Sequence, residues 1–450
     1  MVNKVQVKHL FIRIGILSLV LACLQVLLIP SKSFCFEPDT YTYLEFNSFR
    51  TVGYPLFLKF CALFSSNCKF YSAIQIILSL FSILWLILEL TAWIESRKTL
   101  YVIWLLFALN PIIYIMNVKI LTEGLFSTLA VCIICCSFKV ARKCSVQINI
   151  GLISFFIGLS ITIRPSGYFY LVAILFLVLY FSKREEIIKN ISWAYIPASV
   201  LLMISSMVFN LYHDSKKSLF PSHIFAKGMM LLEEKDITEL PPNLQKQAPS
   251  YVKLNQNISN LEGFNLRHLA HTRLEVLYQH HLNHGLSPQE RKNIGFKLVR
   301  KYKSDYAKMT FLNFLHLWTG FEVFSQREAD SLALQNQHWI KPDTVSQNSW
   351  TDVLTKKRRA FPLYYLRYLL IIPLIMIIFY SIRSLYLTVK KDNNSVTKLL
   401  GFFSICSIGS SLLTALISIA TLRYTLILTP FLLIIFILSS LSPVQMIKTD

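Results

Sequence analysis

Long apolar segments set the strongest limit on how this chain folds. The sequence contains about ten of them, most close to the roughly 20 residues that cross the hydrocarbon core of a bilayer. They lie at about 11–30, 70–94, 99–117, 122–138, 149–164, 167–181, 191–210, 361–381, 399–420 and 424–441. Helices satisfy their own backbone hydrogen bonds in lipid, and segments of this length suit helices. We therefore predict an α-helical polytopic membrane protein.

The composition supports this fold class. Charged residues make up only 15% of the chain, against about 25% in a soluble domain. Such a deficit is expected because ionisable groups in hydrocarbon are costly. The net charge of +21 is also seen in nucleic-acid-binding proteins. In a membrane protein, however, Lys and Arg collect in the cytoplasmic loops. We expect membrane lipids as partners and no nucleic acid.

The distribution of positive charge predicts the orientation. With the N-terminus in the cytoplasm, most basic loop residues also fall inside, including those at 139–143 and 383–398. The positive-inside rule then places both termini in the cytoplasm and the large polar segment outside. The first apolar segment resembles a signal peptide, but it continues to Ile29 and the topology requires it. We expect it to be a retained span.

Three parts follow from this topology. They are a transmembrane module at 1–210 with a first outer loop at 31–69, an extracytoplasmic domain at 211–360, and C-terminal transmembrane helices at 361–450. The extracytoplasmic domain is mainly helical in pattern. Residues 288–318 repeat apolar side chains every three and four positions, as an amphipathic helix does. Ser287 is the expected cap before Pro288.

Ionisable and aromatic residues gather at the predicted outer ends of the spans. The first outer loop is rich in aromatic residues rather than Ser and Gly. The gathered residues are Asp39, Tyr43, Arg50, Tyr54, Lys119, Glu123, Arg164 and Arg423. Two acids with four cations suit an anionic lipid phosphate and a proton-accepting or metal-holding carboxylate. Each residue taken alone has a simpler interpretation. Glu123 could be an acid that caps a helix N-terminus, and each arginine could extend to the lipid headgroups.

Several motifs match a known family in order along the chain. They are Pro38-Asp39-Thr40 with Tyr43-Leu44, Arg50 with Gly53-Tyr54-Pro55-Leu56-Phe57-Leu58, Thr122-Glu123-Gly124-Leu125-Phe126, Gly158-Leu159 with Arg164-Pro165, and Arg423-Tyr424. On these residues the chain resembles the GT-C glycosyltransferases of the family 39-like group. That group includes protein O-mannosyltransferases, lipid A aminoarabinose transferases and many bacterial envelope-sugar transferases, so the resemblance implies a bacterial inner (plasma) membrane. The segment 211–360 matches none of its motifs.

The resemblance implies a donor, a mechanism and site roles. The donor is a polyprenyl-phosphate sugar, and the acceptor is a lipid, a glycan or a protein, attacked with inversion at the extracytoplasmic face. Asp39 would be the catalytic base or would position the acceptor. The residues implied to bind substrate or the leaving phosphate are Tyr43, Arg50, Tyr54, Lys119, Arg164 and Arg423. Glu123 would bind the acceptor or, with Asp39, a divalent cation such as Mg²⁺ or Mn²⁺.

One departure from the family pattern concerns the acids of the first loop. Several relatives have two adjacent acids there, whereas Pro38 separates Glu37 from Asp39 in this chain. A strict acid pair is therefore not present. The chain also has no Gly-rich phosphate loop and no Asp-x-Asp motif, so an ordinary nucleotide-sugar site is not expected.

Three other functions remain open. A membrane-anchored binding protein would leave the outer-face charges of the spans unexplained. An O-antigen ligase or polymerase would also use outer-face arginines, but the first-loop motif argues against it. A lipid-linked sugar transporter would carry charge near the middle of its spans. Within the spans only Glu89 stands out, and it lies near a predicted cytoplasmic end.

Cysteine and histidine motifs give weaker signals. Cys35 and Cys68 fall in or beside the first outer loop, where an oxidising compartment permits a disulfide. The Cys132-x-x-Cys135-Cys136 motif lies in a span without a histidine, so core packing explains it better than a metal.

Two clusters in the extracytoplasmic domain are also ambiguous. His280 and His284 have the spacing of zinc ligands on a helix, but no nearby cysteine completes a set. The basic residues 356–359 are either a contact with lipid phosphates or part of the basic surface of the domain.

Overall fold

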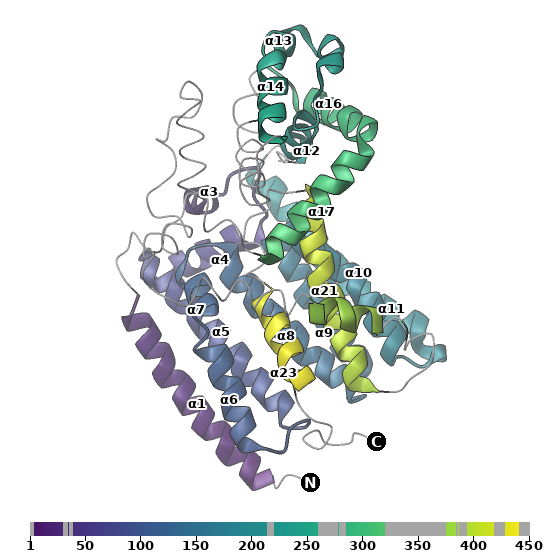
Figure 1. The fold of residues 1–450 in the computed structure, drawn as a ribbon. Helices are drawn as coiled ribbons and strands as arrows, with labels where there is room; N and C mark the ends of the chain where they lie inside the picture. The colour runs from purple at the N-terminus through teal and green to yellow at the C-terminus, as the bar shows by residue number, and fades with distance from the viewer. Residues whose placement is uncertain are drawn as a thin grey trace. The chain divides into compact units, whose positions relative to one another are not determined.

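The computed structural model divides the chain into two compact units (Figure 1). It describes residues 4–29, 35, 39–213, 220–259, 278, 285–319, 375–383, 386, 394–417 and 428–440. The first unit comprises Met1–Lys216, Ile372–Ser410 and Leu426–Asp450, and the second comprises Lys217–Ile371 and Ser411–Thr425. Every regular element within the described residues is a helix. Each unit is treated separately below.

Six described helices are long and apolar enough to cross a membrane. They are α1 (Lys4–Leu27), α5 (Cys68–Leu90), α8 (Thr122–Ala141), α9 (Val146–Ile163), α11 (Ile187–Tyr212) and α21 (Ser395–Ile417). A seventh span is counted if α6 (Arg97–Ala108) and α7 (Pro111–Val118) are taken together, although they bend by 41° at their junction. These helices agree with the predicted class, a helical polytopic membrane protein.

The predicted number of ten spans is not reached within the described residues. α10 (Tyr168–Phe181) and α23 (Thr429–Ser440) are apolar but have only 14 and 12 residues. At 1.5 Å per residue they extend only about 20 Å, against a hydrocarbon core of about 30 Å. Pro165 begins a short 3-10 turn before α10, which shortens the helix. Most of the predicted span at 361–381 lies outside the described residues.

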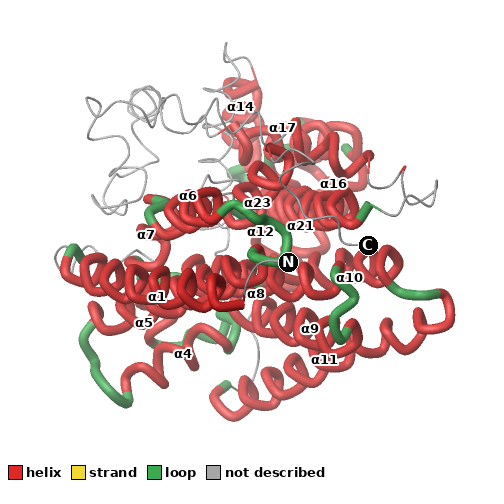
Figure 2. The backbone as a smooth tube through the Cα atoms, turned by 90° about the horizontal axis from the view of Figure 1, so that it is seen from below, coloured by secondary structure: helices red, strands yellow, loops and turns green. Residues whose placement is uncertain are grey.

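The first unit is built by neighbouring helices in the order α1, α5, α8, α9 and α11 (Figure 2). Small side chains allow α9 and α11 to approach closely. A Cβ atom on Gly158 would lie 2.9 Å from the Cα atom of Ala198. Pro197 lies inside α11, and the Ala198 N–H next to it donates to the Ser154 hydroxyl at 3.1 Å. This contact satisfies a backbone group that lipid cannot satisfy.

A buried acid joins the last turns of α5 and α8. Glu89 forms ion pairs with Arg142 and, at 3.3 Å, with Lys139. The Trp85 indole N–H donates to the same carboxylate at 3.0 Å. The charge of this residue is therefore balanced by cations at a helix end, away from the middle of the span.

The second unit contains α12 (Phe220–Met229), η3 (Glu234–Glu239), α13 (Pro242–Gln245), α14 (Ala248–Ser259), α16 (Pro288–Lys301) and α17 (Lys303–Thr319). The predicted cap is confirmed, because the Ser287 hydroxyl accepts from the Glu290 N–H at 3.2 Å in a capping box. The predicted helix over 288–318 is interrupted at Tyr302. Gly295 allows α16 to touch α12, since a Cβ atom there would lie 2.5 Å from the Ile224 carbonyl oxygen.

Asp236 should make the second unit sensitive to acid. Burial alone would raise the pKa of its carboxyl, but hydrogen bonds from Lys301, from Tyr302 at 2.7 Å and from the Glu233 N–H outweigh burial and lower it. A lowered folded-state pKa contributes stability that is present above the ordinary aspartate pKa and lost as the pH falls through the lowered value. Limited proteolysis of the second unit in the full chain should therefore accelerate below about pH 4.

The control for this prediction is Asp236→Asn. The variant should be less stable at neutral pH, and its proteolysis should depend less on pH than that of the wild type. If both proteins show the same acid dependence, Asp236 is not the responsible group.

Candidate functional site

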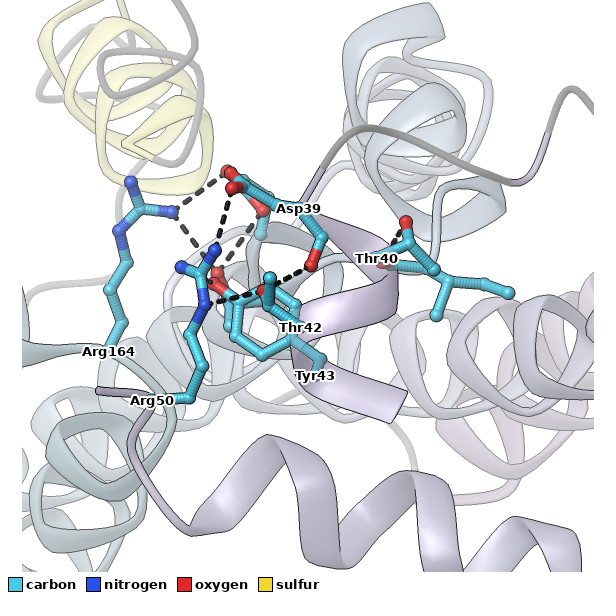
Figure 3. A network of polar contacts seen from close by, with 9 residues as sticks. Asp39, Thr40, Thr42, Tyr43, Arg50 and Arg164 are labelled. Atoms are coloured by element: carbon cyan, nitrogen blue, oxygen red, sulfur yellow. Dashed lines mark hydrogen bonds and ion pairs between the residues drawn. The ribbon is translucent and has the colours of Figure 1, made fainter. Parts of the chain in front are cut away.

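Asp39 and Arg50 meet at the start of a short helix. Asp39 is the N-cap residue of α3 (Thr40–Leu44). The Arg50 guanidinium lies 2.6 Å from the Asp39 carboxylate and donates to the Thr42 hydroxyl at 2.8 Å and the Tyr43 hydroxyl at 3.1 Å (Figure 3). The Asp39 side chain remains 34% exposed and the Arg50 side chain 16% exposed. The predicted acid and base of the first loop are thus one ion pair that solvent still reaches.

A second, more deeply buried ion pair lies between α8 and α9. Glu123 is in the first turn of α8, and Arg164 is the C-cap of α9. Their charged atoms are 2.9 Å apart, with only 2% and 9% of the side chains exposed. Arg164 also donates to the Thr122 hydroxyl at 3.3 Å. This pair fixes the ends of two membrane helices to each other.

Tyr43 connects the two ion pairs. Its ring lies 4.3 Å from the Arg50 guanidinium carbon, measured to the ring centroid. Burial is the main cause that raises the pKa of the Tyr43 phenol; the positive charge of Arg50 opposes it, and the negative charges of Glu123 and Asp39 add to it. Figure 3 shows the Arg50 guanidinium directed toward Asp39 and the Arg164 side chain in the same network, where Arg164 contacts Glu123 and Thr122. The two pairs therefore form one site, called the charged site below.

The other predicted residues of this region are buried beside the charged site. The Tyr54 ring packs edge-on against Tyr43, with centroids 5.2 Å apart. Lys119 is 1% exposed and lies between α7 and α8. Its backbone carbonyl accepts from the Gln75 amide at 3.0 Å. Arg423 lies outside the described residues.

Sequence reasoning missed a polar stripe on α5. The buried members are Ser72, Gln75, Ser79 and Ser82. The Ser72 hydroxyl donates to the Val118 carbonyl at 2.5 Å, and Gln75 also donates to the Asn117 carbonyl at 3.1 Å. The spacing of three and four within an apolar segment was a detectable signal, because it places polar groups on one helix face.

An apolar groove of about 460 Å³ runs along α4 (Gly53–Ala62), α5, α8 and α9. Its lining includes Ile163, which directly precedes Arg164, and Leu125, two residues after Glu123. It continues to Trp85 and Phe156, deeper in the helical layer. The groove therefore begins next to the charged site and follows the membrane helices away from it.

The substitution Gly53→Ala should disturb the junction between groove and charged site. A Cβ atom on Gly53 would lie 2.4 Å from the Thr162 hydroxyl oxygen and 2.9 Å from the Thr162 carbonyl. Relief requires α4 to move away from α9, which also strains the 2.7 Å hydrogen bond from the Thr51 hydroxyl to the Ile163 carbonyl. We expect a loss of about 1–3 kcal/mol in stability, measured as a lower thermal midpoint in detergent.

Gly15→Ala is the matched control for Gly53→Ala. A Cβ atom on Gly15 meets no atom within 4 Å, so the midpoint should not fall. Equal midpoints for the two variants would contradict the close contact at Gly53.

The charged site is a poor fit for the predicted divalent cation. Asp39 and Glu123, the two acids expected to bind it, each face an arginine. No group of three or more His, Cys, Asp or Glu side chains suited to a metal occurs within the described part of the chain. His280 and His284 lie outside that part, as do the basic residues 356–359.

Comparison with known proteins adds no relative. No protein-family model, curated protein or solved structure matches this chain. The family resemblance thus stands on the motif residues themselves.

Proposed function

We propose that this protein is a membrane glycosyltransferase that uses a polyprenyl-phosphate sugar as donor. It transfers the sugar with inversion to a lipid, glycan or protein acceptor at the extracytoplasmic face. The observation that carries the proposal is the charged site, with its two arginines, at one end of an apolar groove. A lipid phosphate has the same two parts, an anionic head and an apolar tail.

The charged site supplies the groups that the head of the donor requires. Arginine recognises phosphate oxygens through pairs of parallel hydrogen bonds. Arg50 is partly exposed and held mainly by side chains of the first loop, so an incoming phosphate reaches it. Arg164 is more deeply buried and paired with Glu123, and it contributes positive charge behind this position.

The chemical step then assigns a role to Asp39. As the donor phosphate binds Arg50, it competes with the Asp39 carboxylate for the guanidinium and releases that carboxylate to act as a base. The acceptor oxygen bonds to the anomeric carbon, and its proton passes to Asp39. The bond from carbon to the phosphate oxygen breaks, and the electron pair leaves with polyprenyl phosphate. Arg50 and Arg164 stabilise the negative charge that grows on this leaving group.

Transport is less well supported by the described helices. Glu89 and Lys139 lie near the last turns of their helices, and Glu123 lies in a first turn. A transporter of lipid-linked sugars would be expected to bind near the midplane.

The substitution Leu129→Trp tests the groove as the site of the donor tail. Leu129 lines the groove, and an indole there would occupy part of it. The indole should displace about ten carbon contacts between the donor tail and the groove, and at ~0.1–0.2 kcal/mol each this loss costs about 1–2 kcal/mol of binding. The value of kcat/KM for a long-chain donor should therefore fall roughly tenfold. A donor with one or two isoprene units should be affected much less. Release of polyprenyl phosphate is the measurement.

The matched control is Leu106→Trp, the same change at an exposed position of α6. It should leave kcat/KM for both donors unchanged. If Leu129→Trp lowers the rate equally for long and short donors, the groove does not bind the tail.

A further inference from the structure

Cys35 and the first turns of α5, which begins at Cys68, both contact the junction of α7 and α8. The Ile120 N–H donates to the Cys35 carbonyl at 2.9 Å. Two residues earlier, at the end of α7, the Val118 carbonyl accepts from the Ser72 hydroxyl at 2.5 Å. Ser72 follows Cys68 by one turn of α5, and the Ser72 hydroxyl lies 3.4 Å from the Cys68 carbonyl oxygen.

The two thiols share the surroundings of Ser72. The Cys35 side chain is fully buried, and Ser72, Cys68 and Lys69 are among the groups that influence its thiol. Burial raises the pKa of the Cys35 thiol, and the nearby Cys68 also raises it. Cys68 is half-buried, and both residues are free thiols in the structure. The structure therefore places both cysteines in the same region, next to Ser72.

We propose that Cys35 and Cys68 become linked by a disulfide in the mature protein. This inference rests on the proposed extracytoplasmic placement of the first loop, because disulfides form and persist in oxidising compartments. Each thiol gives up one proton and one electron as the S–S bond forms. The disulfide of an extracytoplasmic thiol oxidoreductase accepts the two electrons and becomes two thiols.

The link would constrain the segment that carries the charged site. Asp39 and Arg50 lie between the two cysteines in the sequence, together with α3 and α4. The Lys69 ammonium already donates to the Ile29 carbonyl at 3.1 Å, which places the end of the first membrane helix next to the start of α5. A disulfide would close this segment at both ends and limit the positions that Asp39 can take.

Trapping of thiols in the full chain tests the link without any assay of activity. Membranes are quenched in acid, the protein is denatured with excess N-ethylmaleimide and no reductant, and its peptides are analysed by mass spectrometry. We expect a joined peptide pair containing Cys35 and Cys68, with no maleimide on either residue. Reduction before trapping should convert both to maleimide adducts. Cys144, which is exposed and predicted to be cytoplasmic, should carry maleimide in both samples.

Variants give each outcome a single meaning. In Cys35→Ser, Cys68 should become alkylated without reductant, and in Cys68→Ser the same should hold for Cys35. Maleimide on both residues of the unreduced wild type would overturn the proposal, as would a joined peptide containing Cys61 instead of either partner. If the disulfide is present but the protein transfers no sugar, only the proposed function is refuted. If the protein transfers sugar while Cys35 and Cys68 are both free thiols, only the disulfide is refuted.

Discussion

Replacing Asp39 with asparagine should lower the turnover number for sugar transfer by about 10²–10⁴-fold, the range that a general base contributes. Asparagine keeps the shape of the side chain but cannot take the acceptor proton. Binding of the donor should be kept or improved, because Arg50 loses a competing carboxylate 2.6 Å away. The prediction therefore separates kcat from KM, and both are obtained from initial rates of polyprenyl phosphate release.

The control is Glu45→Gln, which neutralises an exposed acid at the end of the same short helix. It should leave kcat within about twofold of the wild type. Turnover that survives Asp39→Asn would move the base elsewhere, and Glu123 would then be the next acid to examine.

The second large effect concerns the buried pair of Glu123 and Arg164. Glu123→Ala should destabilise the first unit by about 3–5 kcal/mol, because it removes the carboxylate that balances a guanidinium only 9% exposed. The double variant Glu123→Ala/Arg164→Met should recover part of this loss, since it also removes the buried charge. The thermal midpoint of the purified protein in detergent, compared across the two variants, measures the coupling.

Glu185→Ala is the control for this stability series. It removes an acid from an exposed 3-10 turn in the first unit and should leave the midpoint nearly unchanged. A fall after Glu123→Ala no larger than that after Glu185→Ala would show that the pair contributes little. A double variant as unstable as the single one would show that the two charges are not coupled.

The positions of several membrane helices could be predicted because the length of an apolar segment is read directly from the local sequence. The helices α5, α8 and α9 agree with their apolar segments to within a few residues, and Arg164-Pro165 separates α9 from α10 as the sequence indicates. Within the described residues, fewer full spans are found than the ten predicted. Hydropathy does not distinguish a full span from an apolar helix of 12 to 14 residues such as α23 or α10.

The membership of the charged site was partly predictable, but its pairing was not. Asp39, Glu123, Arg50 and Arg164 were found because ionisable groups are rare at that depth. Which arginine faces which acid depends on how α3 and the ends of α8 and α9 meet, and that contact joins residues more than 40 positions apart. The pairing with Arg164 also changes the interpretation of Glu123. Neutralising the buried Arg164 charge is a sufficient role for this acid.

The most direct test of the proposed function follows the donor itself. Purified protein in lipid vesicles is supplied with a panel of labelled polyprenyl-phosphate sugars and a membrane extract as acceptor. Free polyprenyl phosphate and labelled product are then measured together. The proposed transferase predicts that both appear in equal amounts for at least one donor. Movement of an intact donor across the bilayer, with no polyprenyl phosphate released from any member of the panel, would contradict the proposal and indicate a transporter.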